Sequence, residues 1–209
     1  KESEMKSYAE MDEMSADILK ELGNIGTGNA ITSLAQMMGI PLDISSPSLH
    51  LAQVQEIYTL LEQSQEVETG ILVEIKGEIT GMFLFFLNES FTNIVLDEIL
   101  EKRERNILEL DDLERSLLSE LGNIMCGSYI RALSALMDMD IDVSVPELCV
   151  DMGGAILSVP LARIMSKSAD ILLIENQFQI NHHSFSGRIL FFPDPECLEP
   201  ILMKLGIGK

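Results

Sequence analysis

The chain has few basic residues and no long apolar run, and both shortages exclude classes of function. Its 209 residues include 14 Lys and Arg against 34 Asp and Glu, a formal net charge of -20. Such a surface repels the phosphates of nucleic acids and anionic lipids, so we expect no nucleic-acid partner. No apolar run reaches the about 20 residues that a membrane-spanning helix needs, so we also expect no membrane insertion.

Cysteine and histidine are too sparse for most disulfide or metal chemistry. The chain has three cysteines, Cys126, Cys149 and Cys197. An odd number without paired spacing favours a reducing cytosol over a disulfide framework, and we expect a cytoplasmic protein. His182 and His183 are adjacent and point in different directions, with His50 as their only companion, which argues against a metal site. Because the phosphate-binding pattern G-x-x-x-x-G-K-[ST] is also missing, we expect no cofactor and no metal of the chain's own.

What the chain does contain is one motif that occurs twice, 99 positions apart. The run DILKELGNIGTGNA begins at Asp17, and the run SLLSELGNIMCGSY begins at Ser116. Without a gap, 13 of 31 aligned positions are identical between residues 17–47 and 116–146. An internal repeat of this length indicates two copies of one structural unit.

Each copy of the motif places its polar residues on one face of a predicted helix. At about 100° per residue, Asp17, Glu21, Asn24 and Gly28 fall within a wedge of roughly 60°, opposite an apolar arc. We call these four residues the first stripe. The second stripe is formed by the residues at the same positions of the second copy: Ser116, Glu120, Asn123 and Gly127.

A polar stripe on an amphipathic helix is usually no more than its solvated face. Repetition favours a function instead, because Glu and Asn match between the copies whereas neighbouring surface positions such as Lys20 and Ser119 differ. Asn is also a poor residue in the middle of a helix, since its side chain competes for backbone hydrogen bonds. Each stripe glycine costs a helix about 1 kcal/mol relative to Ala, and it lets a partner approach the backbone closely.

The motif D/S-x-x-x-E-x-x-N, present from Asp17 and again from Ser116, resembles the signature of the CheC/CheX/FliY phosphatases of bacterial and archaeal chemotaxis. The runs ELGNIGTGNA and ELGNIMCGSY resemble the CheC type in particular, and the resemblance covers essentially the whole chain. It implies a protein of two-component signalling that accelerates dephosphorylation of the phosphorylated response regulator CheY. The Mg²⁺ ion of that reaction is expected in the receiver substrate.

The roles of the stripe residues follow from this resemblance. Asn24 and Asn123 would each hold a water at the aspartyl phosphate, because an amide both donates and accepts hydrogen bonds. Glu21 and Glu120 would accept a charge-assisted hydrogen bond from the regulator's active-site lysine. Four further residues are expected to contact the docked regulator: Asp17, Gly28, Ser116 and Gly127.

Three alternatives stay open at this point. We favour two competent motifs, but the bulkier Met125 and Tyr129, where the first copy has Gly26 and Ala30, would weaken the second if they held the regulator away. The resemblance also implies a heterodimer with the deamidase CheD, for which Asp151 is a candidate contact unless its segment is an ordinary loop. A competing function is a non-catalytic flagellar switch or scaffold module of the FliM or FliY type that binds CheY.

The remaining sequence predicts an α+β fold, which the resemblance also implies. We expect a pseudo-twofold internal duplication with a roughly six-stranded, mainly antiparallel sheet and packed helices. A single domain of residues 1–209 would consist of two fused repeats, about 12–102 and 111–205. Strands are predicted at residues 49–57, 70–78, 81–87, 148–157, 171–180 and 185–192. Further helices are predicted at residues 89–102, after the cap Asn88, and at 195–205, and Asp111 or Asp112 is predicted to cap the second motif helix.

Overall fold

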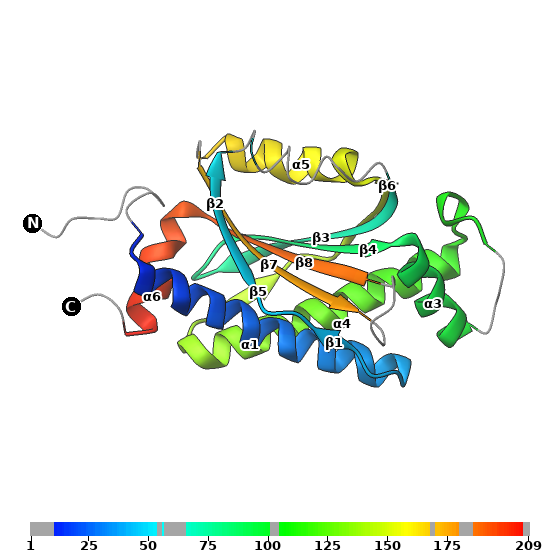
Figure 1. Cartoon of the computed structure of the whole chain (residues 1–209), viewed down its shortest axis with the longest axis horizontal. Coiled ribbons are helices and arrows are strands. Elements are labelled where there is room, and N and C mark those ends of the chain that lie inside the picture. Colours follow the sequence, from blue (N-terminus) through cyan, green and yellow to red (C-terminus); the bar gives the residue numbers. More distant parts are fainter. Residues whose placement is uncertain are drawn as a thin grey trace, which may run out of the picture.

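The computed structural model of the chain describes residues 11–53, 56, 66–100, 105–167, 170–179 and 186–206 (Figure 1). In chain order the elements are α1 (Glu13–Met38), β1 (Asp43–Ile44), β2 (Ser48–Gln53), β3 (Val67–Gly77), β4 (Gly81–Asn88), α3 (Glu89–Leu100), η2 (Ile107–Glu109), α4 (Asp112–Met137), β5 (Ile141–Val143), β6 (Glu147–Met152), α5 (Gly153–Met165), β7 (Asp170–Gln179), β8 (Ser186–Pro193), η3 (Pro195–Cys197) and α6 (Leu198–Lys204). The predicted α+β class is confirmed.

The strands form one sheet in which every pairing among the described residues is antiparallel. The order is β1-β7-β8-β4-β3-β5, with β2 also paired to β7 and β6 also paired to β3. The sheet has eight strands rather than about six. The two additional strands, β1 and β5, have two and three residues, which is too short for an alternating pattern in the sequence.

The strand order has a twofold pattern. Each strand of one half of the chain has a counterpart in the other half, and replacing every strand by its counterpart gives the same order read from the opposite edge. The exchange takes β1 to β5, β3 to β7 and β4 to β8, so the central β4–β8 pair lies on a pseudo-twofold axis. It also takes the β2–β7 pair to the β6–β3 pair, and each half therefore completes the sheet of the other. This order supports the two-repeat organisation, while the limits 12–102 and 111–205 stay a prediction.

Helices cover both faces of the curled sheet. Helices α1 and α4 lie side by side under one face, and α5 lies across the opposite face (Figure 1). Alternate residues of β4 enter the two cores: Phe83, Phe85 and Leu87 the core beneath α1 and α4, and Met82, Leu84 and Phe86 the core beneath α5. Because successive side chains of a strand point to opposite faces, one face of the sheet is apolar toward α1 and α4, and the motif helices pack against it.

The prediction of a strand over residues 148–157 is wrong beyond Met152. β6 ends there, and α5 begins at Gly153 and contains Pro160, which ordinarily disfavours a helix. A short apolar run fits a strand and a buried helix equally well. The tertiary structure decides for the helix, because the buried side of α5 covers apolar side chains on the second face of the sheet.

Side chains at the helix N-termini define where the helices begin. Asp12 caps α1 by accepting a hydrogen bond of 2.8 Å from the Ser15 backbone N–H. Asp111, one of the two predicted residues, caps α4 in a reciprocal pair with Glu114. Asn88 accepts a hydrogen bond of 2.8 Å from the Phe91 N–H, so the predicted cap of α3 is confirmed.

Candidate active site

Both motif helices expose their stripes to solvent. In α1, Asp17, Glu21 and Asn24 are exposed and Gly28 is half-buried. The second stripe on α4 has the same pattern: Ser116, Glu120 and Asn123 are exposed, and Gly127 is half-buried. The structure therefore brings together each predicted set of four residues on one accessible face.

A retained glycine beneath each stripe brings its helix close to the sheet. A Cβ atom at Gly23 of α1 would lie 2.5 Å from Cγ2 of Ile174, and one at Gly122 of α4 would lie 2.5 Å from Cγ2 of Ile71. Both contacts are closer than side-chain packing allows. These two glycines of the ELGN runs are therefore retained for packing, whereas the neighbouring Glu and Asn have no contact that the fold requires.

The two stripe glycines differ in what surrounds them. A Cβ atom at Gly28 would meet nothing within 4 Å, whereas one at Gly127 would lie 3.2 Å from the Nη1 atom of Arg131. Arg131 also donates a hydrogen bond of 2.9 Å to the Ser128 hydroxyl. The second stripe therefore has a cation beside it, at the position where the first copy has Thr32, and the sequence analysis did not assign Arg131 a role.

The polar groups inside the stripes are arranged differently too. Asn123 donates a hydrogen bond of 3.4 Å to Oε2 of Glu120, which orients the two functional groups toward each other. In the first stripe Asp17 instead forms an exposed ion pair of 3.3 Å with Lys20. Both contacts are at the surface and weak, so a docking partner replaces them at little cost.

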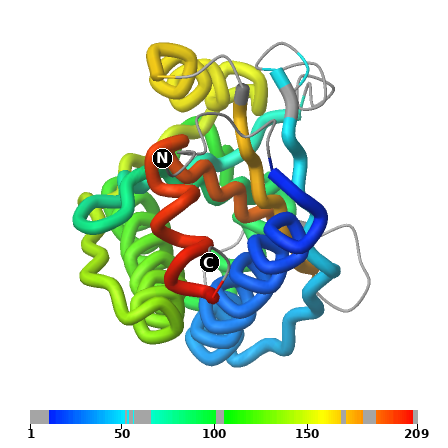
Figure 2. Tube along the Cα trace, turned by 90° about the vertical axis from the view of Figure 1, so that its left-hand side faces the viewer, coloured from blue at the N-terminus to red at the C-terminus, as the bar shows by residue number. Residues whose placement is uncertain are grey.

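The two motif helices run antiparallel and touch near their middles. Tyr129 of α4 occupies the space where Gly26 of α1 has no side chain, and the Ser33 and Ser128 hydroxyls are 2.7 Å apart. Figure 2 shows α1 and α4 adjacent along their length, with α6 near one end of the pair. Residue 26 lies against residue 129 and residue 33 against residue 128, so Asn24 and Asn123 are separated by about eight to fourteen residues, or about 12 to 21 Å, along the helix axes.

The open question about the second motif is answered in part by burial. Met125 and Tyr129 are fully buried, so neither lies on the stripe and neither holds a partner away from it.

Burial also raises the pKa of the Cys126 thiol in α4 to about 12, which makes that cysteine an unsuitable nucleophile near neutral pH.

Asp151 lies at the end of a strand and not in a loop. It is exposed in β6, pairs with Glu68 of β3, and is followed by exposed Met152 and the start of α5. Leu148 and Val150 of β6 pack against the core beneath α1 and α4, so by alternation Asp151 is on the other face of the sheet. A contact at Asp151 would therefore use a different surface from the two stripes.

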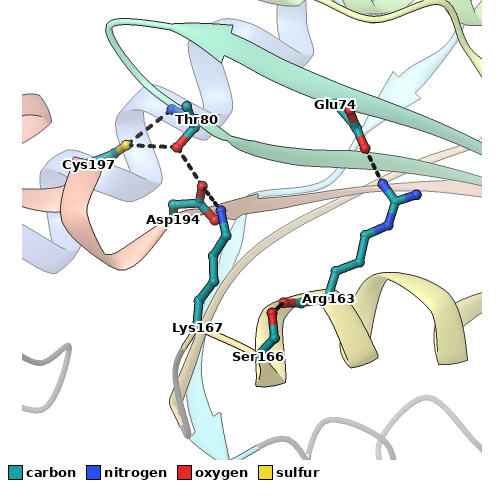
Figure 3. A network of polar contacts seen from close by, with 7 residues as sticks. All are labelled: Glu74, Thr80, Arg163, Ser166, Lys167, Asp194 and Cys197. Atoms are coloured by element: carbon teal, nitrogen blue, oxygen red, sulfur yellow. Dashed lines mark hydrogen bonds and ion pairs between the residues drawn. The ribbon is translucent and has the colours of Figure 1, made fainter.

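A cavity of about 380 Å³ lies where the C-terminal end of α5 meets the β3–β4 hairpin. Its cations are already paired: Arg163 contacts Glu74, and Lys167 donates a hydrogen bond of 2.5 Å to Asp194 (Figure 3). The hydrogen bond to Asp194 raises the pKa of Lys167. These contacts attach α5 to the sheet and leave neither cation available for a ligand.

The described part of the chain has no group of three or more His, Cys, Asp or Glu side chains placed to hold a metal ion. No helix in that part is long and apolar enough to cross a membrane. His182 and His183 lie outside the described residues.

The fold and the paired stripes define a class of protein: an α+β domain of pseudo-twofold symmetry that exposes one Glu/Asn helix face in each half. Residues 14–51 and 113–150 match the model of the CheC-like family. Each matched segment contains one complete stripe, and the matches begin within two residues of the first residue of α1 and α4.

Curated relatives agree with this family. The chain is 27% identical over 206 residues to the CheY-P phosphatase CheC of Bacillus subtilis, covering 97% of this chain and 99% of that protein. It is 25% identical over 148 residues to the flagellar motor switch phosphatase FliY of Bacillus subtilis, covering 70% of this chain and 38% of that protein.

Solved structures show the same fold. Thermotoga maritima FliY superposes with a TM-score of 0.73 at 18% identity, over 93% of this chain and 97% of that one. The FliM middle domain of Helicobacter pylori superposes with a TM-score of 0.62 at 13% identity, over 93% and 99%. By sequence the chain is thus similar to the CheC-like family, and its fold is shared by FliY and by the FliM middle domain.

Proposed function

We propose that this protein accelerates hydrolysis of the aspartyl phosphate of phosphorylated CheY, with Asn24 and Asn123 as the catalytic residues. The observation that carries this proposal is the pair of exposed stripes, in which Glu and Asn have the same register and the same exposure in both halves. The fold does not need either residue, and mid-helix asparagine is unfavourable. The names of the relatives as CheY-P phosphatases support the same substrate.

Asparagine can position a water molecule, but it cannot act as a general acid or base. Its amide has no useful basicity, but it donates and accepts hydrogen bonds and so holds a water in line with the P–O bond. Attack of that water on phosphorus forms the new P–O bond and breaks the bond to the aspartyl oxygen. The products are inorganic phosphate and the aspartate carboxylate, and the receiver supplies the Mg²⁺ that stabilises the charge on the phosphoryl oxygens.

The charge of the chain fits a partner that brings its own cations. With a net charge of -20, the surface disfavours a free phosphorylated small molecule. Glu21 and Glu120, each about one turn before an asparagine, would accept hydrogen bonds from a receiver lysine and set the register of docking. Asp17, Ser116 and the two stripe glycines would form the edge of the same contact.

The decisive experiment measures phosphate release from a phosphorylated receiver domain in Mg²⁺. Wild-type protein should accelerate release well above the receiver's own rate. Asn24→Ala with Asn123→Ala should lower the acceleration at least tenfold, about 1.4 kcal/mol of barrier, while receiver binding persists. Asn29→Ala is the matched control, because Asn29 is an exposed asparagine of α1 outside the stripe and bonds only to its own helix at Ile25.

The alternative function, a non-catalytic switch module that binds CheY, predicts a different result. Such a module would bind the receiver and leave its dephosphorylation rate unchanged. The FliM middle domains have the same fold as this chain, so the fold alone does not distinguish the two functions. The stripes argue against it, since a scaffold has no need for Glu and Asn on both helices.

We also propose that CheD binds at the β6–α5 junction around Asp151. Asp151 and Met152 are exposed there, and Ala155, Val159 and Ala162 continue an exposed apolar side along α5. Binding at this surface leaves both stripes free for the receiver. Asp151→Lys should abolish co-purification with CheD and leave phosphate release by the protein alone unchanged.

A further inference from the structure

Each stripe continues beyond the motif into one exposed, large apolar side chain. Met14 lies three residues before Asp17 and Leu113 lies three residues before Ser116, at the same position of the two repeats. Their exposed fractions are 65% and 64%. At about 100° per residue, each falls roughly 50° from the centre of its stripe, slightly beyond the stripe's edge and on the same helix face.

Folding does not account for these two residues. Both are the second residue of their helix, where acidic and polar side chains are favoured by the helix dipole. The apolar contacts that anchor each helix start come from the residues before the caps, Met11 and Leu110, which pack against the core. A single exposed apolar residue is ordinary, but here two equivalent positions of the repeat are apolar and equally exposed, although surface positions such as Lys20 and Ser119 differ between the copies.

The surroundings of Met14 and Leu113 are also repeated. Two acidic residues precede each one, Asp12 and Glu13 in the first copy and Asp111 and Asp112 in the second, and all four are exposed. The surface of a partner that is complementary to this region would therefore present an apolar patch with cations beside it. From this residue to the stripe glycine the surface extends over about 21 Å of helix, which is the scale of a protein contact and not of a small ligand.

We propose that Met14 and Leu113 are apolar anchors that dock the receiver domain on the two stripes. This inference rests on the proposed function and names a part of the contact that the motif lacks. The hydrogen bonds of Asn replace bonds to water and contribute little net affinity. Burial of a methionine or leucine side chain supplies affinity without touching the reacting atoms. Met14 and Leu113 are therefore positioning residues for substrate binding.

The test compares variants of the full chain in steady-state phosphate release and in direct titration of the receiver. Met14→Gln with Leu113→Gln should raise KM and the dissociation constant at least fivefold, with kcat within twofold of wild type. Met14→Leu with Leu113→Met exchanges the two residues between the copies and should behave as wild type. The matched control is Val145→Thr with Met203→Gln, which changes two exposed apolar residues outside the stripes and should alter neither constant.

Each other result overturns the inference in a recognisable way. If the Gln variant keeps KM and the dissociation constant within twofold of wild type, neither residue docks the receiver. If it changes only the sedimentation of the free protein, the surface binds a second copy of this chain. If the exchanged variant is as weak as the Gln variant, the loss comes from a disturbed helix. Wild-type protein that binds the receiver without accelerating phosphate release refutes the proposed function alone, and the titration still decides the docking role.

Discussion

Asn24 and Asn123 hold positions that a stable helix would not give to asparagine. Both are exposed in the middle of 26-residue helices, and Asn123 contacts only Glu120 of its own stripe among the hydrogen bonds described. At the residue scale, comparing buried with exposed positions of the motif therefore distinguishes the residues that the fold requires from those that it does not. Residues that the packing needs, such as Gly23 and Gly122, lie beneath the stripes, and the residues to which we assign the proposed chemistry lie on them.

The docking role of the glutamates is testable by reversing their charge. Glu21→Lys with Glu120→Lys would place cations against a cationic receiver site, so we expect the dissociation constant for the receiver to rise more than tenfold. Titration of the phosphorylated receiver measures it. Glu109→Lys with Glu147→Lys makes the same change of net charge at exposed positions outside the stripes. Equal losses in the two variants would assign the effect to overall charge and not to the stripes.

At the scale of one element, Arg131 distinguishes α4 from α1. Its guanidinium lies beside Gly127, about two turns from Glu120, and adds positive charge to the stripe that a receiver lysine would approach. Arg131→Thr, which introduces the residue of the first copy, should increase turnover at the second motif about twofold to tenfold. The measurement uses an Asn24→Ala background, so that only the second motif is active. A lower rate than in that background would show that Arg131 assists docking.

Another element-scale contact joins the two halves of the chain. Arg105, just before η2, forms ion pairs of 3.0 Å with Glu114 of α4 and 2.9 Å with Asp97 of α3. The side chains of Arg105 and Glu114 are 5% and 3% exposed. Loss of one member of a buried pair leaves the other charge without compensation.

Arg105→Gln should therefore lower the free energy of unfolding by about 3 kcal/mol. Chemical unfolding measures the change. Lys76→Gln removes the same charge from an exposed pair with Glu74 and should change the free energy by less than about 1 kcal/mol. Similar losses in both variants would mean that Arg105 acts only through net charge.

At the scale of the whole molecule, the pseudo-twofold arrangement gives two stripes on antiparallel helices. Their asparagines are about 12 to 21 Å apart along the axes, and no hydrogen bond among the described residues connects one stripe with the other. Sites that are separated in this way and share no partner behave nearly independently.

The single variants Asn24→Ala and Asn123→Ala should each keep part of the activity, and their losses should combine in the double variant. Phosphate release against one receiver, measured for wild type, both single variants and the double variant, decides this. If Asn24→Ala alone removed all turnover, only the first motif would be catalytic, and Arg131 would be the first residue to examine.

The same four variants also separate chemistry from folding. Because Asn24 and Asn123 are exposed, their replacement by alanine should leave thermal unfolding unchanged or slightly raise its midpoint. A large fall in the midpoint would show that the asparagines support the fold. The loss of phosphate release could not then be assigned to a missing water contact.

The sequence by itself determined the features that depend on local order along the chain. The repeat, the helical register of both stripes, the caps Asn88 and Asp111, and the apolar strands were all predictable, since periodicity and capping act between near neighbours. The prediction failed where a segment lacks a local pattern, as in the short strands β1 and β5, or has an ambiguous one, as in α5. Those segments take their form from the sheet that they complete or cover.

Only the tertiary structure decided what surrounds each stripe. The burial of Met125 and Tyr129 and the exposure of Met14 and Leu113 depend on how α1 and α4 pack against each other and on the sheet. These relations join residues about 100 positions apart, and no periodicity along the chain encodes them. The sequence thus determined which side chains share a helix face, and packing between the two halves decided which of them a partner can reach.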